Sequence, residues 1–169
     1  MPRPQHARKR EKRQTGFAVQ HAGRWTARRG ESNRCAMTTE LTVLAGGCVL
    51  ALVHIFAAVR VKTRQYGSKW NVGARDEALP PPQPLVGRLA RAQANFFETF
   101  PIMIAAVTIV SAAGLTGKWT AIGAWLWLGG RAVYLPLYAL GVPYVRTLAW
   151  GVALLGIVLV LKPALMAAF

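Results

Sequence analysis

The sequence contains few residues that form disulfides or ligate metals. Its 169 residues include two cysteines, Cys35 and Cys48, and three histidines. Cys35 lies in a basic segment and Cys48 in an apolar one, and no C-x-x-C or H-x-x-x-H spacing occurs. Cysteines in such different surroundings support neither a disulfide framework nor a metal site. We therefore predict no bound metal.

Acidic residues are also scarce, which gives the chain a strong positive charge. Six Asp and Glu oppose 21 Lys and Arg, and the formal net charge is +15. A basic chain attracts polyanions such as nucleic acids. Here, however, residues 1–36 hold ten of the basic residues against Glu11 and Glu31, and the remaining positive charge belongs to an apolar sequence. This distribution argues against a nucleic-acid partner.

Residues 1–36 lack sustained apolar periodicity and are predicted to be disordered on their own. They also lack the apolar run of 7 to 15 residues that a signal peptide needs. A polyanion-binding tail and an organelle transit peptide are two alternatives. We favour a third interpretation, in which Met37 is the true start and the upstream stretch is a mis-assigned extension. The domain then covers residues 37–169.

Long apolar runs dominate the sequence after Met37. The whole chain is 53% hydrophobic and 16% charged, which is typical of a membrane protein. Residues 41–59 contain no Asp, Glu, Lys or Arg and are long enough to cross roughly 30 Å of hydrocarbon. Three further runs cover about 85–113, 119–140 and 145–161. The sequence therefore predicts an all-α integral membrane protein built as a bundle of four transmembrane helices.

The basic residues between these runs predict the orientation in the membrane. Counted from Met37, a loop over 60–84 holds five Lys and Arg, and the third loop adds Arg146. Lys118 and Lys162 oppose them from the other side. Loops one and three are therefore predicted to be cytoplasmic. The ten basic residues upstream of Met37 would fall on the opposite side and confuse this signal, which is our reason for doubting the extension.

Polar residues interrupt the second apolar run along one helix face. At 100° per residue they fall within an arc of about 80°. An Arg or Asp at the bilayer centre costs roughly 2.5 to 3.5 kcal/mol on insertion scales, so these side chains must face protein, water or a ligand. They are Arg88, Arg91, Asn95 and Glu98.

The third run carries a smaller polar stripe of Arg131, Tyr134 and Tyr138. Neighbouring antiparallel helices could combine the two stripes into one pocket. Arg and Glu that neutralise each other between helices are an alternative, as is an Asn that ties helices together. We favour a ligand site, because one carboxylate faces several donors, and surplus cationic donors suit a small anionic ligand.

Two motifs resemble a known family. The segment RAQANFFE at 91–98, followed by Pro101, resembles the R-A-x-x-N-x-x-E signature of the MAPEG family, the membrane-associated proteins of eicosanoid and glutathione metabolism. The segment RAVYLPLY at 131–138 resembles the R-x-x-Y-x-x-x-Y motif of its third helix. The resemblance covers residues 37–169, and GARDE and YALGVPYVRTLAW resemble a bacterial branch of the family.

The resemblance implies a homotrimer of four-helix protomers, with glutathione as co-substrate in clefts between subunits that open to the cytoplasm. By position, Glu98 would face the glutathione α-amino group, Gln93 would reach a neighbour's ligand and Arg60 would meet a carboxylate. The full expected set of glutathione-binding residues is Arg60, Arg91, Gln93, Asn95, Glu98, Arg131, Tyr134 and Tyr138.

Arg146 matches the arginine that stabilises the glutathione thiolate in catalytic members. A fixed cation lowers the pKa of a thiol by favouring its charged form, and the thiolate is the nucleophile. The nucleophile would then belong to glutathione, so the chain needs no catalytic cysteine. The interval from Tyr138 to Arg146 differs by one residue from that of the prostaglandin E and leukotriene C synthases.

The predicted function is a glutathione-dependent transferase or peroxidase that acts on lipophilic electrophiles and lies in a bacterial inner membrane. Glutathione would enter from the cytoplasm and the second substrate from the bilayer. One alternative is a non-catalytic membrane protein of the same fold that binds a lipid or glutathione. Another is a small transporter component, with the polar stripe lining its path.

Overall fold

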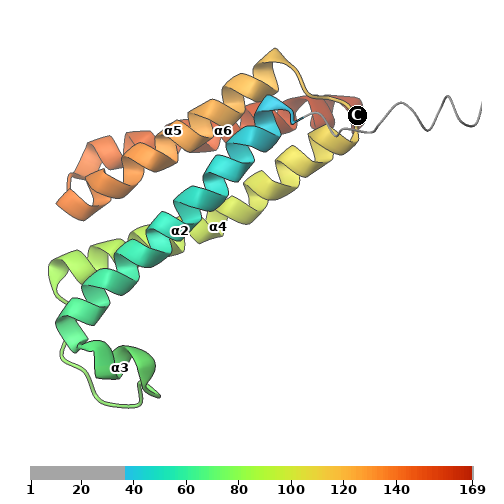
Figure 1. Cartoon of the computed structure of the whole chain (residues 1–169). Coiled ribbons are helices and arrows are strands. Elements are labelled where there is room, and N and C mark those ends of the chain that lie inside the picture. The colour runs from blue at the N-terminus through green and yellow to red at the C-terminus, as the bar shows by residue number, and fades with distance from the viewer. Residues whose placement is uncertain (1–36, 169) are drawn as a thin grey trace, which may run out of the picture. The chain divides into compact units, whose positions relative to one another are not determined.

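The structure is a computed structural model that describes residues 37–168, so the predicted basic extension over 1–36 lies outside the described residues. The described chain is helical and contains no strand. The described residues form four long helices and one short one, whose arrangement can be followed in Figure 1. They are α2 (Thr39–Tyr66), α3 (Ser68–Val72), α4 (Pro84–Ala112), α5 (Lys118–Leu140) and α6 (Pro143–Ala168).

The four predicted apolar runs coincide with the long helices, but the expected loop over 60–84 begins too early. Helix α2 continues to Tyr66, so Arg60 lies on a helix rather than in a loop. Arg, Lys and Gln are good helix formers and extend α2 beyond its apolar part. It ends at Gly67, whose φ of 88° is readily adopted only by glycine. The short helix α3 in the same segment was not predicted.

Prolines begin α4 and α6, and each of these helices also contains an internal proline. Pro84 and Pro143 occupy first-turn positions, where a helix has no use for the missing N–H. Pro101 lies within α4 and Pro163 within α6, and both helices continue through them. As a result, α6 extends past the predicted end at residue 161.

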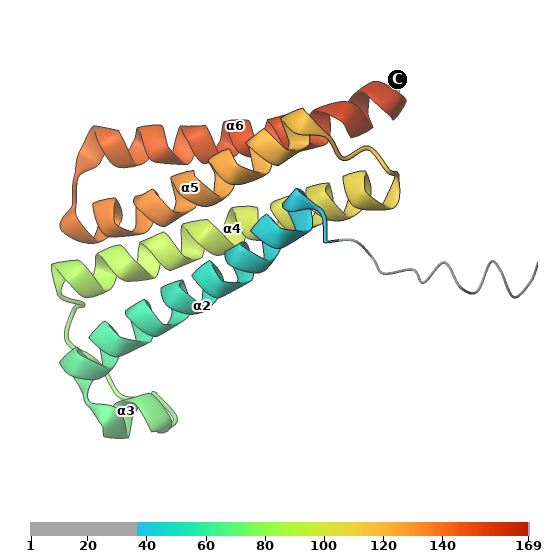
Figure 2. The same cartoon turned by 45° about the horizontal axis from the view of Figure 1, so that its top comes forward.

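Figure 2 shows α2 beside α4 and α5 beside α6, and α2 also contacts α5, so the four long helices form a bundle. The closest pairing joins α5 and α6, where glycines let the two backbones approach. A Cβ atom added to Gly156 would lie 2.5 Å from the Gly123 carbonyl oxygen. One added to Gly130 would lie 2.8 Å from the Ala149 carbonyl oxygen. Small residues at such contacts are typical of helix packing in membranes.

Aromatic side chains fill the core where α2, α4 and α5 meet. Phe100 and Trp127 stack with ring centroids 5.7 Å apart. His54 is buried in α2 and stacks on Phe96 at 4.4 Å. Its Nδ1 lies 2.9 Å from the carbonyl oxygen of Leu50, and this oxygen only accepts, so Nδ1 is the protonated nitrogen. His54 is thus a core residue that supports no metal site among the described residues.

Three of the long helices, α2, α4 and α6, are long and apolar enough to cross a membrane. Helix α5 is not among them. It contains Arg131 and three tryptophans, which lower its hydropathy. Large apolar side chains such as Val49 and Phe56 are exposed on the bundle surface, as expected of side chains that contact lipid. The composition and length of these helices place the protein in a lipid bilayer.

A buried carboxylate ties the start of α2 to the start of α5. Glu40 is 2% exposed, and its Oε1 accepts a hydrogen bond from the Thr120 hydroxyl at 2.5 Å. We expect Thr120→Val to lower the free energy of unfolding by about 1 to 3 kcal/mol, because it leaves a buried carboxylate without this donor. Titration with a denaturing detergent measures the loss. Thr108→Val on the exposed side of α4 is the matched control. Equal losses of stability in both variants would contradict a stabilising role for the hydrogen bond between Thr120 and Glu40.

Candidate functional site

The two predicted polar stripes meet where α4 packs against α5. The Arg131 Nη1 donates to the Asn95 Oδ1 at 2.8 Å, and its Nη2 donates to the Thr99 hydroxyl at 2.5 Å. Arg131 is 0% exposed. Its two terminal nitrogens are therefore bound within the protein, and no part of it is open to a ligand. This differs from the direct ligand contact expected from the sequence.

The contact with Arg131 orients the side chain of Asn95. Since its Oδ1 accepts from Arg131, its amino group is directed away from α5. The Nδ2 lies 3.5 Å from the Glu98 Oε2. Asn95 thus presents hydrogen-bond donors beside an exposed carboxylate. Thr99 was not among the predicted site residues, although its position one turn after Asn95 places it on the same face of α4.

A pocket of about 220 Å³ opens beside Asn95 at the end of α5 and the start of α6. The Arg146 guanidinium lies 4.5 Å above the ring centre of Tyr138. The Tyr134 and Tyr138 rings lie 5.3 Å apart, with the buried Arg131 guanidinium 5.6 Å from the Tyr134 ring. Lining residues are Asn95, Tyr134, Tyr138, Arg146, Thr147 and Trp150. The pocket therefore brings together four of the nine predicted site residues.

Every side chain that lines this pocket carries a hydrogen-bond donor, and none is a carboxylate. Arg146 adds a permanent positive charge. Such a pocket favours an anionic ligand, because charge-assisted hydrogen bonds are the stronger ones. Thr147 and Trp150 were not predicted as lining residues. Trp150 lies four positions after Arg146, so helical spacing places it on the face of α6 that carries Arg146. Thr147 is the next residue after Arg146, and adjacent residues do not share a helix face, so spacing alone does not predict it.

The other predicted residues lie outside the pocket of the single chain. Arg60, Arg91 and Glu98 are exposed, and Gln93 is half-buried. Arg88, a member of the predicted stripe, has a different role. Its Nη1 donates to the carbonyl oxygen of Ala139 at 3.3 Å, so it caps the C-terminal end of α5.

These observations place the protein among helical membrane proteins with a cationic, donor-lined pocket between helices. A model of the MAPEG family matches residues 43–166, and the chain belongs to that family. The family predicted from the two motifs is thereby confirmed. No curated protein and no solved structure matches the sequence.

Proposed function

We propose that this MAPEG protein is a membrane glutathione-dependent transferase or peroxidase that acts on lipophilic electrophiles. The family includes glutathione transferases and related proteins. The observation that carries the proposal is the pocket in which the Arg146 guanidinium lies over the Tyr138 ring, beside the donors of Asn95 and without a carboxylate in the lining. A thiolate or carboxylate of glutathione complements those groups.

The contacts around Asn95 support specific roles in holding the tripeptide. The Asn95 amino group would donate to a carbonyl or carboxylate oxygen of glutathione. The exposed Glu98 carboxylate would accept from the α-amino group. Arg131 would act as a positioning residue, because it fixes the amide of Asn95 from behind. Tyr134 and Tyr138 would form the wall between this part of the ligand and Arg146.

Arg146 would supply the electrostatic part of the chemistry. Its charge favours the thiolate over the thiol, and the displaced proton passes to solvent. In a transferase reaction the sulfur electron pair forms the bond to an electrophilic carbon, and the leaving group departs with the electrons of the broken bond. An electrophile dissolved in the bilayer would reach the sulfur from the lipid side. The chain then needs no nucleophile of its own.

The assembly that we propose has four spans in each protomer and three protomers. Helix α5 pairs closely with the membrane-length α6, which supports a membrane path for both. Arg91 and Glu98 are exposed on the single chain although α4 is also of membrane length. Charges on such a helix need protein or water around them. Neighbouring copies would cover them and complete a cleft that opens to the cytoplasm, where Arg60, Arg91 and Gln93 also contact glutathione.

Calorimetric titration of glutathione into the detergent-solubilised protein tests this site. We expect wild-type protein to bind glutathione, and Asn95→Ala and Glu98→Gln each to weaken binding roughly tenfold, because each removes one polar contact of about 1 to 3 kcal/mol. Thr108→Val, on the same helix but far from the pocket, should bind like wild type. Affinities of the two site variants equal to the wild-type value would contradict the assignment.

Conjugation of a chromogenic electrophile separates a transferase from a binding protein. Turnover that depends on glutathione is expected of the wild-type protein. Tight glutathione binding without turnover would favour the non-catalytic alternative and would leave the binding site itself intact.

A further inference from the structure

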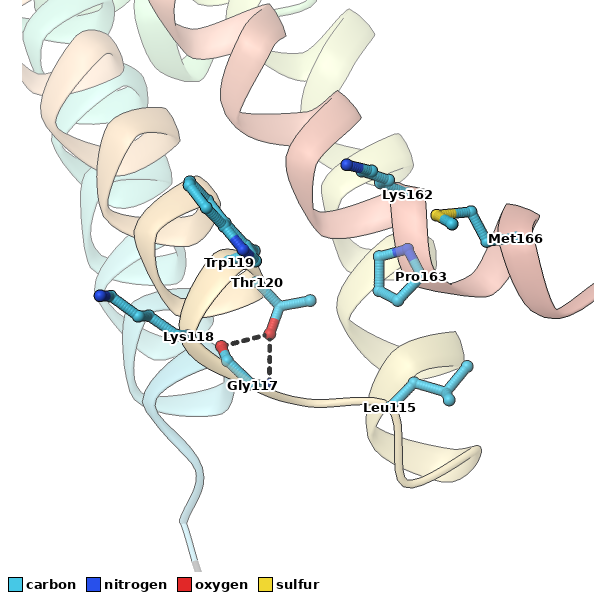
Figure 3. A pocket seen from close by; sticks show the side chains of 8 residues that line it. All are labelled: Leu115, Gly117, Lys118, Trp119, Thr120, Lys162, Pro163 and Met166. Carbon is cyan, nitrogen blue, oxygen red and sulfur yellow. Dashed lines mark hydrogen bonds between the residues drawn. The ribbon is translucent and has the colours of Figure 1, made fainter.

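A second pocket lies at the other end of the α5–α6 pair. It has a volume of about 270 Å³ and lies between the turn before α5, the first turn of α5 and the last turns of α6 (Figure 3). A helix rises 1.5 Å per residue, so Thr120 in this pocket lies roughly 20 Å along α5 from Tyr134 in the candidate site. The two pockets are therefore separate sites.

The interior of this pocket is apolar. Leu115, Pro163 and Met166 form one side, and Trp119 lies across from them on α5 (Figure 3). Thr120 contributes no free polar group, because its hydroxyl bonds to Glu40 and lies 2.8 Å from the Gly117 carbonyl oxygen. A pocket with such apolar walls favours a hydrocarbon chain as its ligand.

Two lysines, Lys118 and Lys162, stand at the edge of these apolar walls, and no acidic residue lines the pocket. Both lysines are exposed. In Figure 3 Lys162 extends toward α5, whereas Lys118 extends along the outer side of α5. The flexible four-carbon stem of Lys118 allows its ammonium group to turn toward the pocket. Glu40 touches the pocket residue Thr120, but it is 2% exposed and already accepts that hydroxyl.

The position of the pocket along the helices corresponds to a membrane surface. Lys162 is near the end of membrane-length α6, where lysine stems lie along hydrocarbon and the ammonium reaches the headgroups. Trp119 is 64% exposed, as is typical of tryptophan at a membrane interface. Exposed apolar side chains continue from the pocket toward the helix centres, with Trp125 on α5 and Val158 on α6.

We propose that this pocket binds an anionic phospholipid. Lys162 and Lys118 hold the phosphodiester, and the first part of an acyl chain lies between Trp119 and the wall formed by Pro163 and Met166. The lipid belongs to the leaflet opposite the candidate site, so it is a bound partner of the fold and not the electrophile. The lysines select an anionic headgroup over a zwitterionic one, because a zwitterionic headgroup brings its own cation toward them.

Native mass spectrometry of the full chain tests the proposal with phosphatidylglycerol and phosphatidylcholine of identical acyl chains. We expect wild-type protein to retain phosphatidylglycerol with roughly tenfold or higher apparent affinity, since lysines at a membrane surface attract anionic lipids. The double variant Lys118→Gln and Lys162→Gln should bind both lipids about equally. Both lysines are exposed, so the fold should tolerate these changes.

The double variant Lys62→Gln and Lys69→Gln is the matched control, because it removes the same charge from α2 and α3 instead of the pocket. It should keep the wild-type preference. Equal affinity of the wild-type protein for the two lipids would overturn the proposal, and so would a preference that survives in the pocket variant or disappears in the control. Glycerol phosphate should displace the bound lipid only weakly. If glycerol phosphate and phosphatidylglycerol displaced the lipid at equal concentrations, the proposal would also be overturned, because the site would then bind a free anion.

Discussion

Replacing Gly156 with valine is expected to push α5 and α6 apart and to remove most of the protein's resistance to unfolding. A Cβ atom at this position would lie 2.5 Å from the Gly123 carbonyl oxygen and 2.7 Å from the Trp127 backbone nitrogen. These are backbone atoms, which move only if a whole helix moves. Overpacking of a core side chain costs about 1 to 3 kcal/mol, and a clash with backbone should exceed the upper end of that range.

Gly151 provides a matched control for this substitution on the same helix. A Cβ atom at Gly151 would meet nothing within 4 Å, so Gly151→Val should change the stability by less than about 1 kcal/mol. Denaturing-detergent titration of both variants measures the difference. Similar midpoints for Gly156→Val and the wild-type protein would show that the backbones do not approach as closely as the structure has them.

Replacing Arg146 with alanine is expected to lower the rate of glutathione conjugation by about a hundredfold or more, with a much smaller change in glutathione affinity. Removing one preorganised group that stabilises a developing or fixed anion typically costs that much in rate. Without the cation the thiol of bound glutathione should also have a higher pKa, so the rate should recover as the pH rises. Initial rates over a pH series, with thiolate absorbance in the ultraviolet, measure both effects.

Arg64→Ala is the control for the loss of a positive charge, because Arg64 is near the end of α2 and does not line the pocket. It should conjugate at the wild-type rate. Arg146→Lys keeps the charge and should retain part of the activity. If Arg146→Ala and Arg64→Ala had the same rate and pH profile, Arg146 would have no part in the chemistry. Tyr134 and Tyr138 would then be the candidates for stabilising the thiolate.

Much of the fold follows from local sequence patterns. The positions and lengths of the apolar runs predicted the bounds of α4 and α5 to within about one residue. The end of α2 was predicted too early, because a change from apolar to basic residues marks the edge of a membrane and not the end of a helix. Arg60 illustrates the difference, since the helix continues six residues beyond it to Tyr66. The apolar run at 119–140 was also predicted to be a membrane span like the other three, whereas α5 is not among the helices that are apolar enough by length and composition.

The candidate site was predicted less completely. Helical spacing placed Asn95 and Arg131 on polar stripes and left open an Asn that ties helices together, but it did not identify Arg131 as the partner of Asn95. Arg131 was expected to face a ligand and is instead buried between Asn95 and Thr99. Arg88 lies on the same predicted stripe as Asn95, yet it caps α5. Angles around one helix say which residues share a face, and they do not say what that face meets.

The sequence by itself determined the helical class, the apolar surfaces that suit a bilayer and the motifs that define the family, because these depend on neighbours along one chain segment. Only the tertiary structure decided that Arg131 supports Asn95 from within, that Arg146 lies over Tyr138, and that Lys118 and Lys162 flank one apolar pocket. Those arrangements depend on the rotation and closeness of packed helices. The glycine contacts bring α5 close to α6, and the packing of α4 against α5 places Asn95 beside Arg131.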